Sequence, residues 1–580
     1  MQYKNLSVTK FGKTFQIVEW TGQDLPSTVY ADTETKKIEF PDEIPDLVLT
    51  VAYTGEEIVY WIRNENLVRF LEALKKSLVV FHTATFDIPV IEKASGLSFD
   101  DQLLANKVMD IAILYRSIFI ATKGLEAKKY ALDALIKEFL NEELEKDDEI
   151  RLTFGQFIEN GKVNYEKISA KHFKYAALDT VATGIIHSIL MQKMKSLPTS
   201  TNLSHQIQLL GEIALGQIAR NGIQVDLEYK NKIEQEFLKK KDQAAEVMAI
   251  YGLQRGKGFQ TAYEKAVKFF NLPLPLTSTG KLSSAVGELE KFSGNPFIKS
   301  FLDFKGVEKQ INFLTLLNSE RVYPRYDSMK VTLRTSCKKP NIQQMPRTGG
   351  IRECFIPKPG HVFIDLDYSA IELASIASIC KKVVGYSVLG DVINSGKCPH
   401  RYAAANIYKV NYDSIEKKDP RRQVAKILNF GLVADMAPLT FVHHAASQGV
   451  IVTEDEAIFL KDEWSSVYHE MRKYWRRAHG RSQCVTRTGF VRSNCSYTEF
   501  LNTPMQSLCA EGAKLMLYFM FRSPYKVVAF VHDQILVEIE EERAAEALPI
   551  ISNIMIDAMS KVIPDIKISV EGEICSRFKK

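Results

Sequence analysis

Two groups of acidic residues have a spacing that suits divalent metal ions. In the segment VYADTETK, Asp32 and Glu34 are two residues apart, so a strand here would turn both carboxylates to one face. Such a pair is costly unless a cation neutralises it, although an Asp-x-Glu pair alone is more typical of an exposed strand than of a metal site. The apolar segment VVFHTATFD predicts a strand that ends at Asp87. In KYAALDT, Tyr175 and Asp179 are four residues apart and adjacent on one face of a helix.

The second acidic group lies in the C-terminal half. The segment GHVFIDLDYSAIELASIASI predicts a strand, a turn at Asp367 and then a helix. The segment YKVVAFVHDQILVEIE predicts a hairpin of two apolar strands whose tip displays Asp533 beside Asp367. Taken alone, the dipeptide His532-Asp533 is typical of an ordinary turn. Two carboxylates that converge here would bridge two magnesium ions, one at a hydroxyl group and one at a triphosphate.

A helix between these two segments carries cations and one aromatic ring. In DPRRQVAKILNFGLVADMA, Asp419 suits an N-cap and Pro420 a helix start. Arg422, Lys426 and Phe430 follow at intervals of four residues, so they share one face within an arc of about 80°. Two cations followed by a flat ring match a triphosphate tail, a sugar and a base. This combination favours nucleotide binding over a solvated basic surface.

The elements that must position these residues divide the chain into regions. Residues 1–195 alternate predicted strands and helices, and residues 196–204 are polar, contain a proline and predict a linker. The stretch 205–325 is mainly helical, and the remainder mixes strands and helices again. At 580 residues the chain is too long for one hydrophobic core, so several domains are expected.

Composition excludes some classes of protein. No apolar run approaches the ~20 residues that cross a bilayer, and the N-terminus lacks the order of a secretory signal. We therefore expect a cytoplasmic protein without a membrane partner. The net charge of +5 is compatible with nucleic acid binding, because a local basic track is offset by acidic metal sites. The eight cysteines lack the spacing of zinc ligands and are expected to be ordinary thiols.

Four acids in this order, with a tyrosine one turn before the last, resemble the DEDDy 3′–5′ exonucleases. The resemblance covers about the first 195 residues and implies an RNase H-like domain. It implies that Tyr175 positions the attacking water and that two divalent ions are held by Asp32, Glu34, Asp87 and Asp179. One difference from the family is Thr83, which stands where an asparagine is usual and touches no metal ligand.

The C-terminal segments resemble motifs A, B and C of the family A DNA polymerases, in the same order, across about residues 205–580. The segments TLRTSCKKPNIQQMPR, NTPMQSLCAEGAKL and QIARNGIQVD resemble further parts of that family. The resemblance implies an α/β multidomain fold with an exonuclease domain at 1–195, a linker at 196–204 and a right-hand polymerase. The polymerase has its thumb at 205–325, its palm at 326–385 and 500–580, and its fingers at 386–499.

The resemblance also implies roles for individual residues. Two Mg²⁺ ions, with Mn²⁺ as an alternative, would be bound by Asp367 and Asp533. Phosphates would be held by Arg422 and Lys426, and Lys426 would protonate the departing pyrophosphate. Phe430 would pack on the sugar and disfavour dideoxynucleotides, while Glu372 would exclude a 2′-hydroxyl. The DNA itself, at the primer terminus and the minor groove, would be contacted by Arg334, His532, Asn502 and Gln506.

Several positions depart from the family pattern. Ala434-Asp435 replaces a Tyr-Gly pair whose tyrosine stacks near the template, so either base selectivity changes or another aromatic residue fills the gap. Ala374 replaces an arginine, and Gln534 replaces a glutamate that is usually accessory. Asp365 shares a strand face with Asp367, and we expect it to have a structural or hydrogen-bonding role.

The expected function is template-directed DNA synthesis with 3′–5′ proofreading. No region before Asp32 remains for a 5′ nuclease, which favours a phage replicative polymerase acting in the host cytoplasm. Expected partners are primer–template DNA, deoxynucleoside triphosphates and a helicase or other replisome protein, with the chain itself monomeric. The alternatives are a polymerase with altered template-base selectivity (for a modified base or lesion bypass), a nuclease whose C-terminal half only binds DNA, and a non-enzymatic accessory protein.

Overall fold

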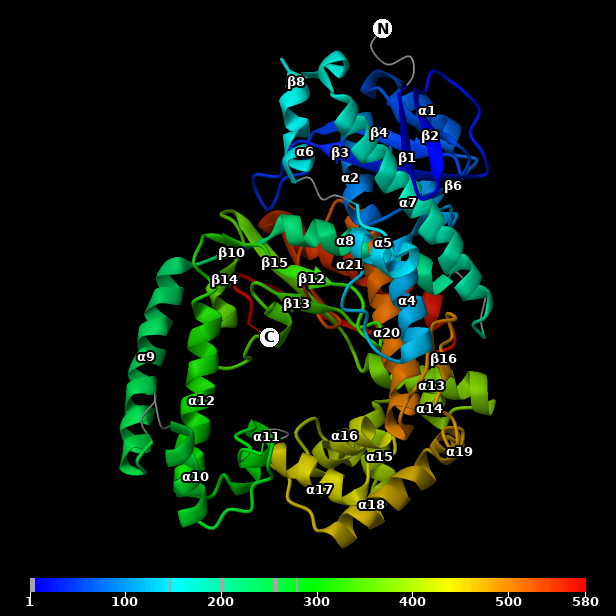
Figure 1. The fold of residues 1–580 in the computed structure, drawn as a ribbon. Coiled ribbons are helices and arrows are strands. Elements are labelled where there is room, and N and C mark those ends of the chain that lie inside the picture. The colour runs from blue at the N-terminus through cyan, green and yellow to red at the C-terminus, as the bar shows by residue number, and fades with distance from the viewer. Residues whose placement is uncertain (1–5, 145–147, 199–202, 254–258, 278–279, 580) are drawn as a thin grey trace.

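The structure is a computed structural model that describes residues 6–144, 148–198, 203–253, 259–277 and 280–579. An N-terminal α/β domain stands above a larger part in which two helical arms project from a central sheet (Figure 1). The left arm contains α9 (Leu227–Ile250) and α12 (Pro296–Leu314), and the right arm contains α16 (Pro420–Leu432) and its neighbours.

The N-terminal domain is built on a seven-stranded mixed sheet in the order β1-β2-β5-β4-β3-β6-β7. Its central strands are almost wholly buried because helices cover both faces. The strands are β1 (Ser7–Lys10), β2 (Lys13–Glu19), β3 (Thr28–Thr35), β4 (Leu47–Tyr53), β5 (Ile58–Ile62), β6 (Leu78–Phe81) and β7 (Val108–Asp110), with a small hairpin of β8 (Ile158–Glu159) and β9 (Lys162–Val163). The helices are α1 (Leu67–Leu74), α2 (Ala84–Ser95), α3 (Asp100–Leu104), α4 (Ile111–Lys123), α5 (Leu132–Leu140), α6 (Asp148–Thr153) and α7 (Ala170–Lys195).

The segment after this domain differs from the expected division. Residues 199–202 of the expected 196–204 linker lie outside the described residues, and α8 (Leu203–Asn221) begins within that linker range. Although α8 falls within the expected thumb, it packs against α20 (Tyr497–Phe521) and not in the projecting arm. The contact includes a bond from Ser204 Oγ to the buried Glu511 carboxylate at 2.6 Å. Apolar side chains on two faces of α8 explain the difference, because both faces have to be buried. A helix in a projecting arm would need only one apolar face.

The left arm, within the expected thumb range, projects from the small sheet β11-β10-β14. Its helices pack their aromatic side chains into a separate small core. Besides α9 and α12, the elements of this part are β10 (Ile223–Val225), α10 (Phe259–Phe269), α11 (Val286–Leu289), β11 (Arg321–Val322) and β14 (Phe355–Ile356). A second small sheet, formed by β12 (Arg325–Asp327) and β13 (Ser336–Lys338), follows near the base of the arm.

The central sheet is antiparallel in the order β18-β19-β15-β20. Its strands are β15 (His361–Tyr368), β18 (Lys526–Val531), β19 (Gln534–Glu540) and β20 (Val570–Cys575). The helices α13 (Ile371–Val384), α20 and α21 (Glu541–Val562) bury apolar faces in the large core that this region shares with α8 and one face of the N-terminal sheet.

In the sequence, the right arm is inserted between the two segments that form this sheet region. It comprises α14 (Val388–Asn394), α15 (Pro399–Ile407), α16, α17 (Pro438–Ser447), α18 (Glu454–Val467), α19 (Glu470–Arg476) and the hairpin of β16 (Cys484–Val485) and β17 (Val491–Arg492). The predicted start of α16 is confirmed, because Pro420 occupies its first turn and the Asp419 side chain accepts from the Arg421 amide at 2.8 Å.

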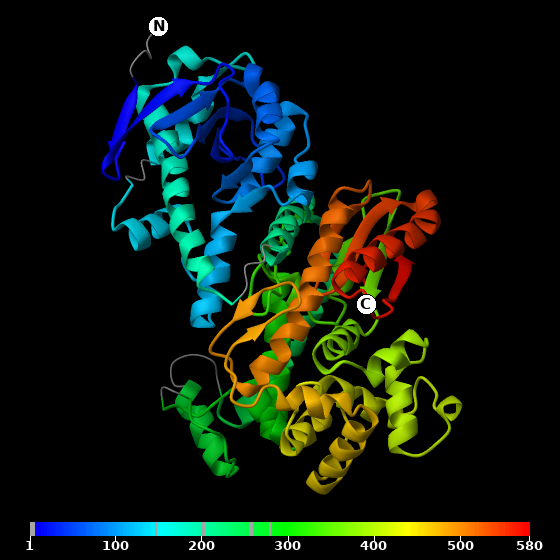
Figure 2. The ribbon, with the colours of Figure 1, turned by 90° about the vertical axis from the view of Figure 1, so that its right-hand side faces the viewer.

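Polar contacts fasten the N-terminal domain to the rest of the molecule. The loop after β17 reaches α4, where Ser493 Oγ donates to the Ala121 carbonyl at 2.5 Å and Asn494 Nδ2 donates to the Lys123 carbonyl at 3.1 Å. At the end of α20, Arg522 forms ion pairs with Glu92 at 2.8 Å and Asp100 at 2.5 Å. Figure 2 shows the side of the molecule where α20 and the β16–β17 hairpin run up to this domain.

Among the described helices, none is both long enough and apolar enough to cross a lipid bilayer.

Candidate active sites

Three of the four N-terminal acids converge above the mixed sheet. Asp32 and Glu34 lie on β3, and Asp179 projects from α7, which crosses that strand. One carboxylate oxygen from each of the three lies within 4.8 Å of the others. The prediction that Asp32 and Glu34 share one face of a strand is confirmed. This is the spacing expected of oxygen ligands around a shared divalent cation.

Asp87 reaches the same site from a different element than expected. The strand β6 ends at Phe81, and Asp87 lies in the first turn of α2, so the prediction of a strand ending at this acid is wrong. The cause is Thr83, whose φ of 70° reverses the chain between the strand and the helix. Asp87 Oδ1 accepts from the amide of Thr33 at 3.0 Å and from its hydroxyl at 2.7 Å, which places the carboxyl beside β3.

The electrostatics of this cluster fit a cation. Burial, followed by the charge of the neighbouring acids, raises the pKa of both Asp32 and Glu34 well above their ordinary values. Burial also raises the pKa of Asp87 to about 8, although the bonds from Thr33 oppose that rise. Carboxylates that resist ionisation at neutral pH are stabilised in their charged form by a bound divalent ion, so the residues present suit such an ion.

Tyr175 lies one helical turn before Asp179 on α7. Burial, and then the charges of Asp179, Glu34 and Asp32, raises the pKa of its hydroxyl. The phenol therefore stays protonated and can donate a hydrogen bond to a group held among the acids. This chemistry is compatible with the orientation of a water molecule.

The acids of the central sheet are brought together by strand register. Asp367 stands opposite Gln534 at the end of β15, and Asp533 precedes Gln534 in the turn between β18 and β19. The predicted hairpin with Asp533 at its tip is confirmed. Burial and then the charge of Asp367 raise the pKa of Asp533 to about 7. Two partly buried carboxylates that repel each other in this way suit a shared divalent cation.

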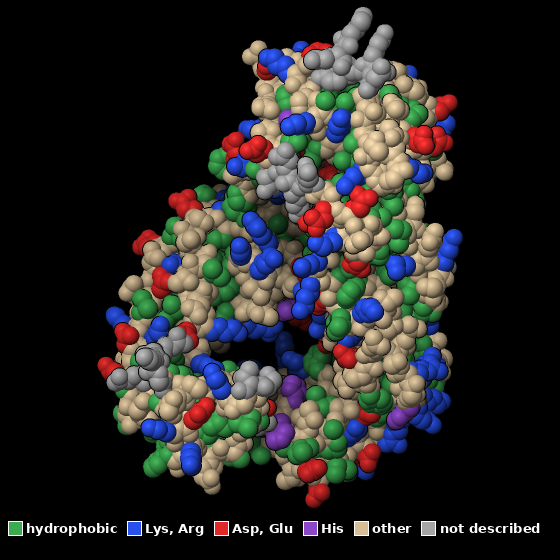
Figure 3. Space-filling model, viewed as in Figure 1, with side chains coloured by type: hydrophobic (Ala, Val, Ile, Leu, Met, Phe, Trp, Pro, Cys, Tyr) green, Lys and Arg blue, Asp and Glu red, His purple; other side chains and the backbone are tan. Residues whose placement is uncertain are grey.

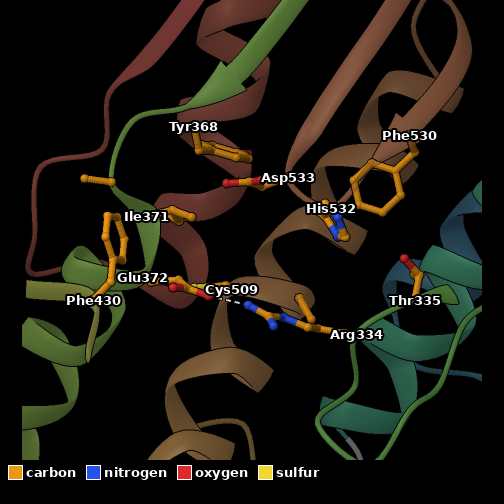
Figure 4. Close-up of a pocket in the computed structure, with 12 residues that line it drawn as sticks. Arg334, Thr335, Tyr368, Ile371, Glu372, Phe430, Cys509, Phe530, His532 and Asp533 are labelled. Atoms are coloured by element: carbon orange, nitrogen blue, oxygen red, sulfur yellow. Dashed lines mark hydrogen bonds and ion pairs between the residues drawn. The ribbon is translucent and has the colours of Figure 1, made fainter. Parts of the chain in front are cut away.

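A cavity of about 410 Å³ opens beside these carboxylates. Figure 4 shows Phe430, Glu372 and Asp533 around the same space, with Arg334 paired to Glu372. The cavity is lined by five residues that the sequence singled out, namely Arg334, Glu372, Phe430, His532 and Asp533. The volume and the mixture of charged and aromatic walls suit part of a nucleotide.

The cations of α16 extend from one side of this cavity. Arg422 and Lys426 lie two turns and one turn before Phe430 on the same helix. Arg422 donates to the Lys417 carbonyl at 3.0 Å, and the side chain of Lys426 is exposed. The helix thus presents two positive charges followed by an exposed ring, as its sequence predicts.

Sequence reasoning missed His400 at this site. Its ring lies 5.6 Å from that of Phe430, and Asn429 Nδ2 donates to its Nδ1 at 2.8 Å. Burial and then the charges of Arg422 and Lys426 lower the pKa of His400 to about 4, so it is neutral at physiological pH. The segment CPHRYAAA signals only a helix start, and its packing against α16 has no local signature.

The remaining predicted DNA contacts lie along α20. Asn502 and Gln506 are partly buried on this helix, and Cys509 and Ala510, one turn beyond Gln506, line the cavity. The two amides therefore lie on the helix that forms part of the cavity wall, at positions before the residues that line the cavity.

The departures from the family pattern have identifiable surroundings. Gln534 Nε2 donates to Asp365 Oδ1 at 2.6 Å, so the predicted hydrogen-bonding role of Asp365 is confirmed. Ala434 is buried at the end of α16. The neighbouring Asp435 accepts from the Tyr497 hydroxyl at 2.6 Å and pairs with Lys461 at 2.7 Å. An aromatic residue from another helix thus stands next to the 434–435 position.

Backbone strain gathers around the cavity. Ala370 and His532 line it and have φ values of 52° and 63°, and Leu333, which precedes Arg334, has a φ of 60°. Residues other than glycine rarely adopt this left-handed conformation, and the surrounding structure must hold them there. At Leu333 the buried Lys514 donates to the carbonyl oxygen at 2.6 Å. Such strained turns are common at functional sites because they fix side chains accurately.

Comparisons with known proteins agree with this architecture. Residues 16–195 match the family model described as 3′-5′ exonuclease, and residues 227–580 match the model of DNA polymerase family A. The chain therefore belongs to DNA polymerase family A, with an exonuclease domain ahead of the polymerase domain.

Individual relatives share this arrangement at low identity. The DNA polymerase of Mycobacterium phage D29 is 23% identical over 94% of this chain and 90% of the relative. DNA polymerase I of Aquifex aeolicus is 28% identical over 54% of this chain, and that of Pseudomonas aeruginosa is 24% identical over 84%. The chain spans only 56% and 55% of the lengths of these two bacterial relatives.

A solved structure supports the fold. It is described as the POL domain of Pol1 from M. smegmatis in complex with DNA primer-template and dNTP. It matches 95% of both chains with a TM-score of 0.71 at 18% sequence identity.

Proposed function

We propose that this chain extends a DNA primer on a template strand and removes mispaired 3′ ends. The supporting observation is the convergence of Asp367 and Asp533 beside a cavity that also contains Phe430 and Glu372. Paired acids distinguish this site from a surface that merely binds DNA, since binding a polyanion requires only cations. The membership in DNA polymerase family A is consistent with this activity.

In the proposed synthesis reaction, a deoxynucleoside triphosphate enters the cavity with its phosphates toward the α16 cations. Arg422 and Lys426 hold the β- and γ-phosphates, and Lys426 donates a proton to the departing pyrophosphate. Phe430 packs on the sugar, and Glu372 occupies the space that a 2′-hydroxyl would need. The DNA is oriented by His532 and Arg334 at the primer terminus and by Asn502 and Gln506 in the minor groove.

The proposed metal ions are two at each site, Mg²⁺ or Mn²⁺. At the polymerase site the residues that would hold them are Asp367 and Asp533, and at the exonuclease site they are Asp32, Glu34, Asp87 and Asp179. When bound, such ions supply Lewis acidity, which lowers the pKa of the attacking hydroxyl or water and neutralises charge on the phosphate. At the exonuclease site Tyr175 donates a hydrogen bond that orients the attacking water.

We assign the chain a replicative role of the phage type, acting as a monomer on primer–template DNA with a helicase or another replisome protein. The similarity to the DNA polymerase of Mycobacterium phage D29, which extends over 90% of the length of that relative, supports this assignment. A second candidate is a polymerase with altered template-base selectivity. It is favoured by Ala434, whose methyl group stands where the family has an aromatic ring.

Separation-of-function variants test the proposal on one labelled primer–template, with and without Mg²⁺. Asp367→Asn should abolish primer extension and leave digestion of single strands intact. Asp32→Ala combined with Glu34→Ala should do the reverse. Loss of both activities in either variant, or of neither, would contradict the assignment of two independent sites. A wild-type chain that digests single strands and never extends a primer would identify a nuclease with a DNA-binding C-terminal half.

A further inference from the structure

The helix α19 exposes one strongly cationic face. Its buried side, formed by Met471, Tyr474 and Trp475, packs against α13, α18 and α20. The opposite side is exposed, and its cations, which we call the α19 cationic face, are Arg472, Lys473, Arg476, Arg477 and, after the helix, Arg481. Lys and Arg side chains gather visibly at this place, on the lower right edge of the molecule (Figure 3).

Few acids neutralise this face. The one acid of the helix, Glu470, is fully buried and accepts from Ser387 Oγ at 3.0 Å and the Leu389 amide at 2.9 Å. Arg472 pairs with the exposed Asp462 at 3.6 Å. In the described parts of the chain, the other four cations have no carboxylate within the 4.0 Å of an ion pair. Most of the positive charge of this face is therefore not neutralised by carboxylates of the chain and can interact with an anionic partner.

The segment after α16 contacts residues beside the α19 cationic face. Tyr497, whose ring lies against that of His479, donates its hydroxyl to Asp435 at 2.6 Å. On its buried side α19 also contacts the end of α16, because Trp475 Nε1 donates to the carbonyl of Val433, the C-cap residue of that helix, at 3.4 Å. Lys461 pairs with Asp435 and lies 5.4 Å from the Trp475 ring. A template strand that leaves the Phe430 cavity past residue 435 would therefore lie near His479, at the edge of the α19 cationic face.

Flat rings accompany the cations. Lys473 Nζ lies 4.8 Å from the Tyr386 ring, whose hydroxyl bonds to His469 Nδ1 at 2.8 Å. His479, also exposed, lies against Tyr497 with ring centroids 5.3 Å apart. An acidic peptide would need only the charges. Single-stranded DNA uses both features, because its phosphates bind cations and its bases stack on rings.

We propose that the α19 cationic face binds the single-stranded 5′ part of the template ahead of the polymerase site. This inference rests on the proposed function, since it assumes a template that crosses the Phe430 cavity. Arginines on the face would form bidentate hydrogen bonds with phosphates, and bases would stack on the rings without sequence preference. The contact would hold the unpaired template away from the primer terminus.

The test compares templates with a short and a long 5′ overhang, of about two and about twelve nucleotides, the latter within the span of typical single-strand sites. The variant Lys473→Gln/Arg476→Gln/Arg477→Gln removes three charges from the face and spares Arg472, which bonds to Ser465. The matched control, Lys13→Gln/Lys75→Gln/Lys76→Gln, removes three exposed lysines from the N-terminal domain. Binding is measured by fluorescence anisotropy over a range of salt, and extension is measured on both templates.

The α19 variant should bind the long overhang about tenfold more weakly, with the salt slope of log affinity reduced by about 2, as three fewer phosphate contacts predict. Binding and extension on the short overhang should match those of the control variant. Equal weakening on both overhangs, or on neither, would overturn the inference. So would unchanged DNA binding combined with charge-dependent binding of polyglutamate, which would indicate an acidic protein partner. Failure of the wild-type chain to extend even the short template would instead contradict the proposed function.

Discussion

The guanidinium group of Arg334 donates to the carboxylate of Glu372 across the wall of the polymerase cavity. This pair holds the Glu372 carboxylate beside Phe430, where an incoming sugar would lie (Figure 4). The pairing joins a strained loop to the first turn of α13, so the shape of the cavity depends on both. A site that discriminates by shape should respond to the volume at this position more than to its charge.

Glu372→Ala should weaken discrimination against ribonucleotides by about tenfold, equivalent to about 1.4 kcal/mol. Glu372→Gln, which keeps the volume and loses the charge, should retain most of the discrimination. Single-nucleotide insertion of a ribonucleotide and its deoxy counterpart gives the ratio of kcat/KM. An alanine variant with the wild-type ratio would show that Glu372 does not select the sugar.

Divalent ion binding at the exonuclease site should depend on pH. The folded pKa of Asp87 is raised to about 8, whereas an unfolded aspartate titrates near 3.9. Through this group the ion-free fold therefore loses stability as the pH rises between those values, and ions that replace the proton should restore it. In an Asp367→Asn background, Mn²⁺ should raise Tm more at pH 8 than at pH 6 and release protons on binding. Adding Asp32→Ala and Glu34→Ala should remove the difference between the two pH values. An equal rise in Tm at both pH values in the Asp367→Asn background alone would contradict the prediction.

Thr83→Asn should stabilise the exonuclease domain. Thr83 is β-branched and has a φ of 70°, a conformation that asparagine tolerates far better. Relief of this strain should add about 1 kcal/mol to the free energy of unfolding, measured by denaturant titration. Thr21→Asn, at an exposed threonine with an ordinary backbone, serves as the control. If Thr83→Asn shifts the midpoint no more than Thr21→Asn does, the backbone strain at Thr83 does not measurably lower the free energy of unfolding.

Ala434→Tyr should alter base selection, since it returns an aromatic ring to the end of α16, the helix proposed to bind the nucleotide. Because Ala434 is buried, the larger side chain should also cost about 1–3 kcal/mol through overpacking, which thermal unfolding would report. Misinsertion frequencies opposite each template base, compared with those of wild type, give the functional effect. Unchanged misinsertion and base preference in a folded variant would end the idea that this position sets selectivity.

The sequence predicted elements with strong local signals. The strand of Asp32, the capped start of α16 and the hairpin that displays Asp533 all follow from residue periodicity and turn chemistry. Asp87 was misplaced because the left-handed turn at Thr83 is formed by a residue type that disfavours it. His400 and Tyr497 were missed because their partners lie 29 and 62 residues away, and packing between helices leaves no trace in local sequence.

The hydrogen bonds between α4 and the β17 loop, together with the ion pairs of Arg522, hold the two candidate active sites in a defined position relative to each other. If the two sites have the proposed activities, a 3′ end would have to separate from its template in order to pass from the polymerase site to the exonuclease site. The choice between extension and removal would then depend on the rate of strand separation relative to the rate of extension, and a mispaired end, which separates faster, would be removed more often.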